Sequence, residues 1–288
     1  MGNIRRKLRY GLILPDFGKA LHPTDLVDLA GEAEDYGWDG FFLWDHMVEW
    51  NSRTPVYDAF TCLAAIATNT KHIRIGTAVT PIPLLKPWII ARQTITLDHL
   101  SNGRLILGVG LGTKESCDYE RFGEPGDNKT LAEKLDESLV IIKGLWSGKP
   151  FRYSGKHYLL KDPIFLPHSI QKPRIPIWVA GYWPRKGPLR RAAKWDGVIP
   201  LRFPGNLLEL DELRTLVEYI KKLRENADNF AVAIIGSTQN PRNVEKVERF
   251  ASAGMTWWFE NLYAKKDSLN SMRKRIRLGP PQLKSQTL

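Results

Sequence analysis

The chain has 288 residues, of which 43% are hydrophobic and 25% charged, a balance typical of a soluble globular protein. It contains no apolar run of about eighteen residues, which argues against a membrane-spanning helix, and its basic start, Met1–Lys7, lacks the apolar stretch of a secretion signal. The two cysteines, Cys62 and Cys117, fit neither a disulfide framework nor a metal-binding spacing. We therefore expect a cytoplasmic protein without a metal site.

The net charge of +11 is concentrated at the two ends of the chain. Residues 1–10 and 265–288 together carry +10, which leaves about +1 for residues 11–264. A basic patch is the usual footprint of nucleic-acid binding, but no nucleic-acid-binding motif accompanies these segments. We expect solvated basic ends instead: a single domain over residues 1–279, followed by a flexible basic tail over 280–288.

Apolar segments of β-type composition alternate with amphipathic helical segments along the chain. The predicted strands are Arg9–Leu14, Gly40–Trp44, Ile73–Val79, Arg104–Val109, Ile175–Ala180, Gly197–Leu201, Phe230–Ile235 and Thr256–Glu260. The predicted helices are Thr24–Tyr36, Ala59–Ala67, Trp88–Leu97, Thr130–Trp146, Leu189–Lys194, Leu208–Arg224, Asn243–Ala253 and Lys266–Ile276. Residues 147–173 are rich in Gly, Pro and Tyr and form an excursion from this rhythm.

Eight β–α pairs predict an α/β protein with parallel strands, either a (β/α)8 TIM barrel or a doubly wound sheet. The barrel is favoured because a closed ring needs no edge strands and because no linker divides the chain. In such a barrel the active site lies at the carboxyl ends of the strands.

Six tryptophans at or near the predicted strands indicate a mouth that holds a flat ring, with packing between strands and helices as the alternative. They are Trp44, Trp50, Trp178, Trp183, Trp257 and Trp258. Gly108, Gly110 and Gly112 lie at and just after the end of the fourth strand, without the helix start and downstream acid of a dinucleotide fingerprint. These glycines would let the backbone approach a cofactor closely.

The segment Ala33–His46 (AEDYGWDGFFLWDH) resembles the second β–α unit of luciferase-like monooxygenases. Further blocks that resemble the family follow in order: Ala64–Thr68 with Ile75–Thr77, Thr96–Arg104, Leu107–Gly112 and Pro176–Gly181. The match covers about residues 8–200. It implies a barrel with a non-covalent flavin or deazaflavin, a small organic substrate, redox chemistry at the strand ends, and a homodimer.

Within this resemblance, His46 is the first candidate catalytic residue, because the position contacts flavin or substrate and serves acid–base chemistry. The alternative is a histidine that ties the strand end to a backbone carbonyl. Asp45 would orient His46 or accept from a ring N–H, although neighbouring residues on a strand point to opposite faces. Trp50, the second catalytic candidate, completes a His-x-x-x-Trp spacing that resembles deazaflavin-dependent sugar-phosphate dehydrogenases.

The resemblance also implies a set of cofactor contacts. The ring would lie against the strand ends that carry Thr77, Ala78, Val79, Gly110, Leu111 and Gly112. The phosphate would lie on the loop of residues 181–191, with a solvated basic loop as the alternative. The residues of that second region are Ala180, Gly181, Tyr182, Arg185 and Lys186. At Ala78–Val79 a cis peptide or a bulge is implied, with an ordinary trans strand as the alternative.

The resemblance implies FMN or the deazaflavin coenzyme F420 as the cofactor, with the Asp45–His46 pair leaning slightly to the deazaflavin. Reduced FMN would support oxygen insertion, whereas the deazaflavin would support hydride transfer. Two other classes stay open. One is a non-catalytic flavin-binding protein, and the other is a cofactor-free barrel hydrolase or isomerase. A hydrolase or isomerase of this kind needs paired carboxylates or a lysine at the strand ends, and the predicted strand ends are poor in both.

Overall fold

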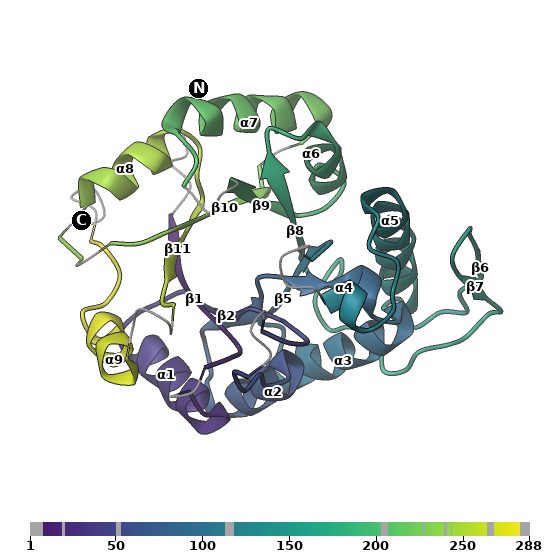
Figure 1. The fold of residues 1–288 in the computed structure, drawn as a ribbon, viewed down its shortest axis with the longest axis horizontal. Helices are drawn as coiled ribbons and strands as arrows, with labels where there is room; N and C mark the ends of the chain where they lie inside the picture. The colour runs from purple at the N-terminus through teal and green to yellow at the C-terminus, as the bar shows by residue number, and fades with distance from the viewer. Residues whose placement is uncertain are drawn as a thin grey trace.

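A closed ring of parallel strands, surrounded by helices, forms the centre of the molecule (Figure 1). The computed structural model describes residues 8–18, 21–49, 53–112, 118–202, 207–226, 228–238, 241–242, 244–263 and 268–282. The ring runs β3-β2-β1-β11-β10-β9-β8-β5 and closes through the pairing of β3 with β5. The predicted (β/α)8 barrel is thus confirmed, and a doubly wound sheet is excluded because these two strands would then be edges.

The elements follow the predicted alternation closely. The barrel strands are β1 (Arg9–Leu14), β2 (Gly40–Leu43), β3 (Arg74–Thr77), β5 (Leu105–Gly110), β8 (Ile177–Trp183), β9 (Gly197–Arg202), β10 (Ala231–Gly236) and β11 (Trp257–Asn261). The helices are α1 (Pro23–Asp35), α2 (Ala59–Asn69), α3 (Pro87–Leu100), α4 (Asp118–Arg121), α5 (Asn128–Leu145), α6 (Lys186–Ala192), α7 (Leu210–Leu223), α8 (Val244–Ser252) and α9 (Leu269–Arg277). A short β4 (Thr80–Pro81) and a 3-10 turn (Ile82–Leu84) follow β3.

One clear difference from prediction lies at the end of the fifth barrel strand. β8 continues to Trp183, three residues past the predicted end at Ala180, because Gly181, Tyr182 and Trp183 pair with β9. The glycine and aromatic residues of this stretch suggested a loop, but the neighbouring strand supplies backbone partners for it. In consequence α6 begins at Lys186 and not at Leu189.

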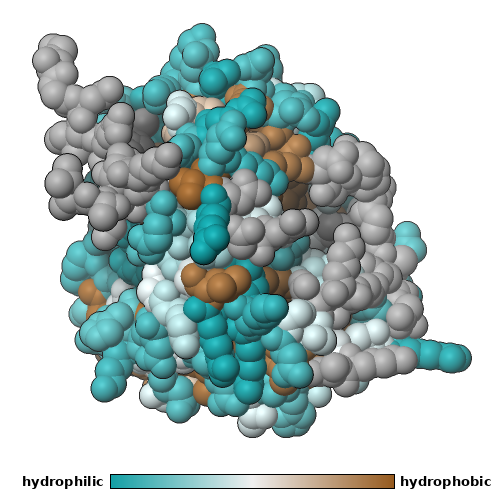
Figure 2. Space-filling model, turned by 90° about the vertical axis from the view of Figure 1, so that its left-hand side faces the viewer, coloured by the Kyte–Doolittle hydropathy of each residue, from teal (hydrophilic) through white to brown (hydrophobic). Residues whose placement is uncertain are grey.

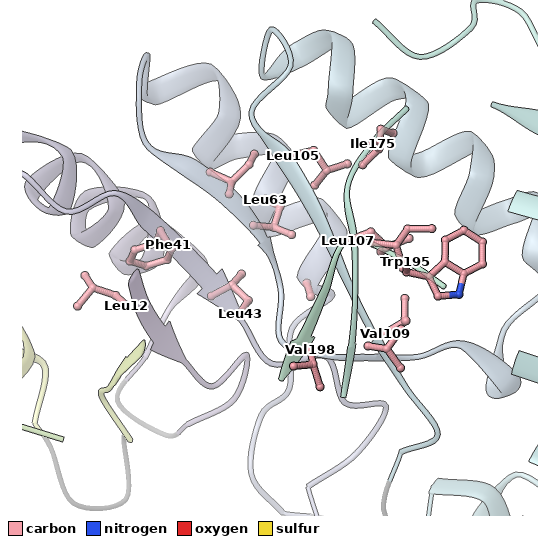
Figure 3. Packing of buried hydrophobic residues seen from close by; sticks show 14 of the residues in the cluster. Leu12, Phe41, Leu43, Leu63, Leu105, Leu107, Val109, Ile175, Trp195 and Val198 are labelled. Carbon is pink, nitrogen blue, oxygen red and sulfur yellow. The ribbon is translucent and has the colours of Figure 1, made fainter. Parts of the chain in front are cut away.

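Alternating strand residues divide the core into two layers. The outward-facing side chains pack against the helices, as Leu12, Phe41, Leu107 and Val198 do together with Leu63 of α2 (Figure 3). The inward-facing side chains fill the barrel with a second cluster. Its buried members are Ile13, Phe42, Ala78, Ile106, Trp178, Ile199, Ala231, Ala233, Trp257 and Phe259.

Three of the tryptophans expected at the mouth are core residues, so the prediction is wrong for them. Trp178 and Trp257 face inward but stand near the starts of their strands, where Gly197 and Gly40 leave room for them. A Cβ on Gly197 would lie 2.6 Å from Trp178, and one on Gly40 would lie 3.0 Å from Trp257. Trp258 faces the helices and donates its indole N–H to Glu260 at 2.9 Å.

The excursion of residues 147–173 carries a small antiparallel hairpin, β6 (Tyr153–Ser154) and β7 (Leu159–Leu160), which projects beyond α5 (Figure 1). Asp98 of α3 fastens its return, because its carboxylate accepts from the backbone N–H of Ile170 at 2.7 Å and from the Gln171 side chain at 2.8 Å. The excursion therefore lies over α3 and α5, outside the strand ring.

The surface of the molecule is mainly hydrophilic in the view of Figure 2. Hydrophobic residues form small separate patches on this face. Among the residues that the structure describes, no helix is long and apolar enough to cross a membrane. Of the predicted tail, Pro280 and Pro281 are buried, and residues 283–288 lie outside the described residues.

Candidate active site

The exits of β1 and β2 bring a carboxylate and an imidazole together at the mouth of the barrel. The two strands are parallel neighbours, with Leu14 paired to Leu43, so the residues that follow them emerge side by side. Asp16 is fully buried, and its Oδ2 accepts the backbone N–H of His46 at 2.8 Å. Its Oδ1 lies 3.5 Å from Nδ1 of the His46 ring. The strand ends thus fix both the backbone and the ring of His46 against one carboxylate.

The surroundings of His46 favour its protonated form. Burial by itself lowers the pKa of the imidazole, but the contact with Asp16 and the negative charges of Asp16, Asp118 and Asp45 outweigh it, so the pKa is raised. The ring packs edge-on against Phe17, with centroids 5.5 Å apart. Its side chain keeps 19% exposure, which leaves it accessible to a ligand in the mouth. A group of this kind can give and take protons near neutral pH.

Asp45 has a different partner from the one expected. Its Oδ2 accepts the hydroxyl of Thr80 at 2.7 Å, on the segment that follows β3. Burial raises the pKa of Asp45 to about 7, with the Thr80 bond lowering it and the charge of Asp16 raising it further. The carboxylate that contacts His46 is therefore Asp16, and Asp45 acts on it through charge.

Small and apolar residues line the mouth above the barrel core. Trp44, Val79, Ala180, Leu201 and Ile235 are half-buried, and they pack on the inward-facing cluster from five different strand ends. The peptide bond between Ala78 and Val79 is cis, one of the two forms that the resemblance implied. A broad apolar surface of this kind suits one face of a flat ring.

The glycine segment after β5 is packed closely around this surface. A Cβ on Gly110 would lie 2.8 Å from Val79 Cγ2, so the backbone here occupies space that a side chain would take. Gly112 has a φ of +75°, which favours glycine. The hydroxyl of Tyr119 donates to the carbonyl of Leu111 at 2.5 Å and fastens the segment. The Thr77 hydroxyl donates to the Gly108 carbonyl at 2.8 Å, so this side chain serves the barrel wall and only its backbone is left for a ligand.

The side chains of the predicted phosphate loop do not point to a common site in the way that those around His46 do. Gly181 is covered by Pro188, whose Cβ would lie 2.2 Å from a Cβ at Gly181. The ammonium of Lys186 lies over the ring of Tyr219 at 5.6 Å, and Arg185 is exposed at the start of α6. Tyr182 is half-buried, and its carbonyl accepts from the backbone N–H of Arg185 at 3.0 Å. Phosphate binding at this loop stays a prediction.

Trp50, the second candidate for catalysis, lies outside the described residues. Sequence reasoning missed Asp16 and Asp118 as acids that act on the imidazole, and Thr80 as the partner of Asp45. Asp16 could have been found, because it directly follows the first strand, which neighbours the second in any barrel of consecutive β–α units. Asp118, which is buried, had no comparable signal.

Comparison with known proteins identifies the family. The profile of the luciferase-like monooxygenase family matches residues 11–238, and the chain belongs to this family. The chain is 33% identical over 167 residues to an F420-dependent glucose-6-phosphate dehydrogenase of Microbacterium testaceum, covering 56% of the chain and 48% of that protein. It is 30% identical over 156 residues to the oxygenase component of a flavin-dependent trigonelline monooxygenase of Acinetobacter baylyi, covering 54% of the chain and 42% of that protein. The chain spans about half the length of the curated relatives it matches.

Solved structures share the fold at low sequence identity. An F420-dependent secondary alcohol dehydrogenase superposes with a TM-score of 0.78 at 17% identity, covering 93% of this chain and 98% of the other. The oxygenating constituent of 3,6-diketocamphane monooxygenase from Pseudomonas putida superposes with a TM-score of 0.75 at 17% identity, covering 98% and 99%. These likenesses establish the barrel and not its chemistry.

Proposed function

We propose that the chain is an oxidoreductase that binds the deazaflavin coenzyme F420 in the mouth of the barrel and transfers hydride between it and a small organic substrate. FMN with oxygen insertion is the second candidate, because both kinds of protein occur among the relatives. The observation that carries the proposal is the His46–Asp16 pair at the rim of an apolar mouth. It provides an acid–base group beside a surface fitted to a flat ring.

The residues at the mouth fit such a ring. The half-buried Val79, Ala180 and Trp44 would contact its faces, and the backbone at Gly110 packs so closely on Val79 that a side chain there would not fit. The backbone of Thr77, Ala78, Leu111 and Gly112 would border it, in the proposed arrangement. The loop with Gly181, Tyr182, Arg185 and Lys186 would hold the phosphate end.

When bound, the cofactor supplies the hydride donor or acceptor, or in reduced FMN the means to activate oxygen. The chain positions the substrate and manages its proton. Asp16 favours a proton on Nδ1 of His46, which leaves Nε2 to exchange a proton with the substrate oxygen. The apolar mouth excludes water, which strengthens the interaction between these charges.

The structure weakens one argument against a cofactor-free hydrolase. Asp16 and Asp45 follow the first two strands, and their charges act on His46 together with that of Asp118 at the start of α4. A hydrolase and a non-catalytic flavin-binding protein are therefore both tested by the same binding experiment.

That experiment is a titration of the purified chain with F420 and, separately, with FMN, followed by absorbance and by quenching of tryptophan fluorescence. We expect saturable binding at one site per chain, with F420 tighter. With F420 bound and oxygen excluded, sugar phosphates and secondary alcohols are then screened for reduction of the cofactor. In a separate assay with reduced FMN and oxygen present, consumption of the substrate is measured. Absence of saturable binding of both cofactors would falsify the proposal, and binding without turnover on any substrate class would support the non-catalytic reading.

The homodimer and the small organic substrate implied by the resemblance belong to the same proposal. Light scattering of the purified chain measures the oligomeric state. A monomer at every concentration would remove the dimer from the proposal without affecting the cofactor.

A further inference from the structure

A second pocket lies at the opposite end of the barrel from His46. It has a volume of about 610 Å³ where the amino ends of β1, β3, β8, β10 and β11 meet. Ile106, Trp178 and Trp257 form its floor. Phe42 lies above this floor inside the barrel, 5.8 Å from Trp178 and 4.5 Å from Phe259 between ring centroids. The packed barrel core therefore separates this pocket from the mouth.

Two arginines at the rim carry positive charge that the described protein does not neutralise. Arg9 is exposed, and its guanidinium lies 5.6 Å from the centre of the Trp257 ring. Arg74 is half-buried and donates from Nη1 to the Gly103 carbonyl at 3.0 Å and to Gln171 Oε1 at 3.1 Å. Over the described part of the chain, neither guanidinium has a carboxylate within ion-pair distance. Burial and then the charge of Arg9 lower the pKa of Arg74, and the charge of the nearby Asp98 offsets this only in part.

The other charges at the rim do not cancel this pair. Arg174 and Asp196 form an ion pair with each other, and Asp196 also accepts the backbone N–H of Ile177 at 2.7 Å. Lys172 and Asp228 also line the pocket, and both are exposed. The lining has four basic side chains and two acidic ones, so its balance is positive.

We propose that this pocket binds a small planar organic anion, an aryl phosphate or aryl carboxylate, with its charged group between Arg9 and Arg74 and its ring on the indoles of Trp178 and Trp257. Guanidinium groups recognise phosphate and carboxylate oxygens through paired N–H donors, and Gln171 holds one of them in place. Trp178 and Trp257 are 4% and 5% exposed, so the ring would contact only the small parts of the two indoles that reach the pocket floor. Neither the cofactor nor the proposed reaction requires this pocket.

The test uses phenyl phosphate as the probe. Inorganic phosphate probes the anion alone, and benzyl alcohol probes the ring alone. Isothermal titration calorimetry of the full chain at low salt should show one phenyl phosphate site per chain, tighter than either single-feature probe. Saturating FMN or F420 should leave this affinity unchanged. Weakened binding in the presence of cofactor would place the probe in the mouth and overturn the proposal.

Two variants test the arginines. Arg9→Gln and Arg74→Gln should each weaken phenyl phosphate binding about tenfold or more, as expected for loss of a charge-assisted contact. Arg214→Gln, which removes an exposed arginine paired with Asp211 on α7, is the matched control and should change nothing. Among the described residues, the Arg9 side chain makes only the cation–π contact, so Arg9→Gln should fold even if Arg74→Gln does not.

Unaltered affinity in Arg9→Gln, or no saturable binding at millimolar probe, would overturn the proposal. The His46→Ala variant separates this result from the proposed function. It should bind phenyl phosphate normally, whatever happens to its turnover.

Discussion

The two ends of the barrel are made from the same eight strands but are built in opposite ways. At the carboxyl end, the inward-facing residues are small or half-buried, as Ala78 and Ala180 are, and carboxylates gather around His46. At the amino end, the indoles of Trp178 and Trp257 fill the ring and arginines stand at its rim.

The difference teaches that the direction a side chain faces does not decide its role. Trp44 and Trp257 both face into the barrel, but Trp257 stands at the first residue of its strand and Trp44 directly follows the last residue of its own. The first fills the core and the second is left half-buried at the mouth. Substitutions at the two ends should therefore separate stability from chemistry.

The largest effect is expected at the imidazole. His46→Ala should reduce turnover about 10²- to 10⁴-fold, which is the usual contribution of a general acid or base. Affinity for the cofactor should stay within a few-fold, because the apolar mouth is unchanged. Steady-state kinetics and cofactor titration measure the two quantities, and His99→Ala on α3 is the control. Full turnover in His46→Ala would reduce this residue to a structural one.

Substitutions at the amino end of the barrel should change the stability of the fold and leave cofactor binding unaffected. Trp257→Leu should lower the free energy of unfolding by about 2–4 kcal/mol, since it leaves a cavity in the barrel core. Its cofactor affinity should not change. Trp44→Leu is the matched variant at the mouth, where we expect a smaller loss of stability and weaker cofactor binding. Urea denaturation and cofactor titration of both variants decide the comparison, and equal behaviour of the pair would contradict it.

Asp45 should make stability at the mouth depend on pH. Its folded-state pKa of about 7 lies above the ordinary 3.8, so the native state binds the proton more tightly. The contribution of Asp45 to the free energy of unfolding is therefore fully present below pH 3.8, where the group is protonated in both states, and it is lost as the pH rises to about 7. Asp45→Asn removes this loss and keeps an acceptor for Thr80. Relative to the unmodified chain it should gain about 1–3 kcal/mol between pH 4 and pH 8.

Urea unfolding at several pH values measures that gain. Asp211→Asn removes an exposed acid of α7 that is not among the charges acting on Asp45, and it serves as a control for general charge effects. A difference between Asp45→Asn and the unmodified chain that does not vary with pH would show that Asp45 titrates normally.

The smallest effect is expected at Asp16. Asp16→Asn should lower the pKa of His46, because it removes a negative charge 3.5 Å from Nδ1 while an amide oxygen can still accept the His46 N–H. Turnover should fall about tenfold, because a hydrogen bond to a charged group contributes about 1.5 kcal/mol, which corresponds to about a factor of ten. NMR titration of the His46 ring, assigned with His46→Ala, measures the pKa directly. An unchanged titration would mean that Asp118 and Asp45 dominate its charge environment.

Local patterns in the sequence determined the barrel and most element ends. Strands such as Arg9–Leu14 were predicted to the residue, because a short apolar run stopped by Pro15 is a local signal. The same holds for the family, whose blocks are contiguous in the chain, and for His46 as the first residue to test.

Tertiary structure alone decided which residues meet. Asp16 and His46 are 30 positions apart, and Arg9 lies on Trp257 only because the ring closes β1 onto β11. Whether a tryptophan fills the core or lines the mouth depends on the glycines of other strands, such as Gly197 of β9 beside Trp178 of β8. Side-chain partners across a closed ring are set by strand order and register, and these arise from packing the whole chain at once.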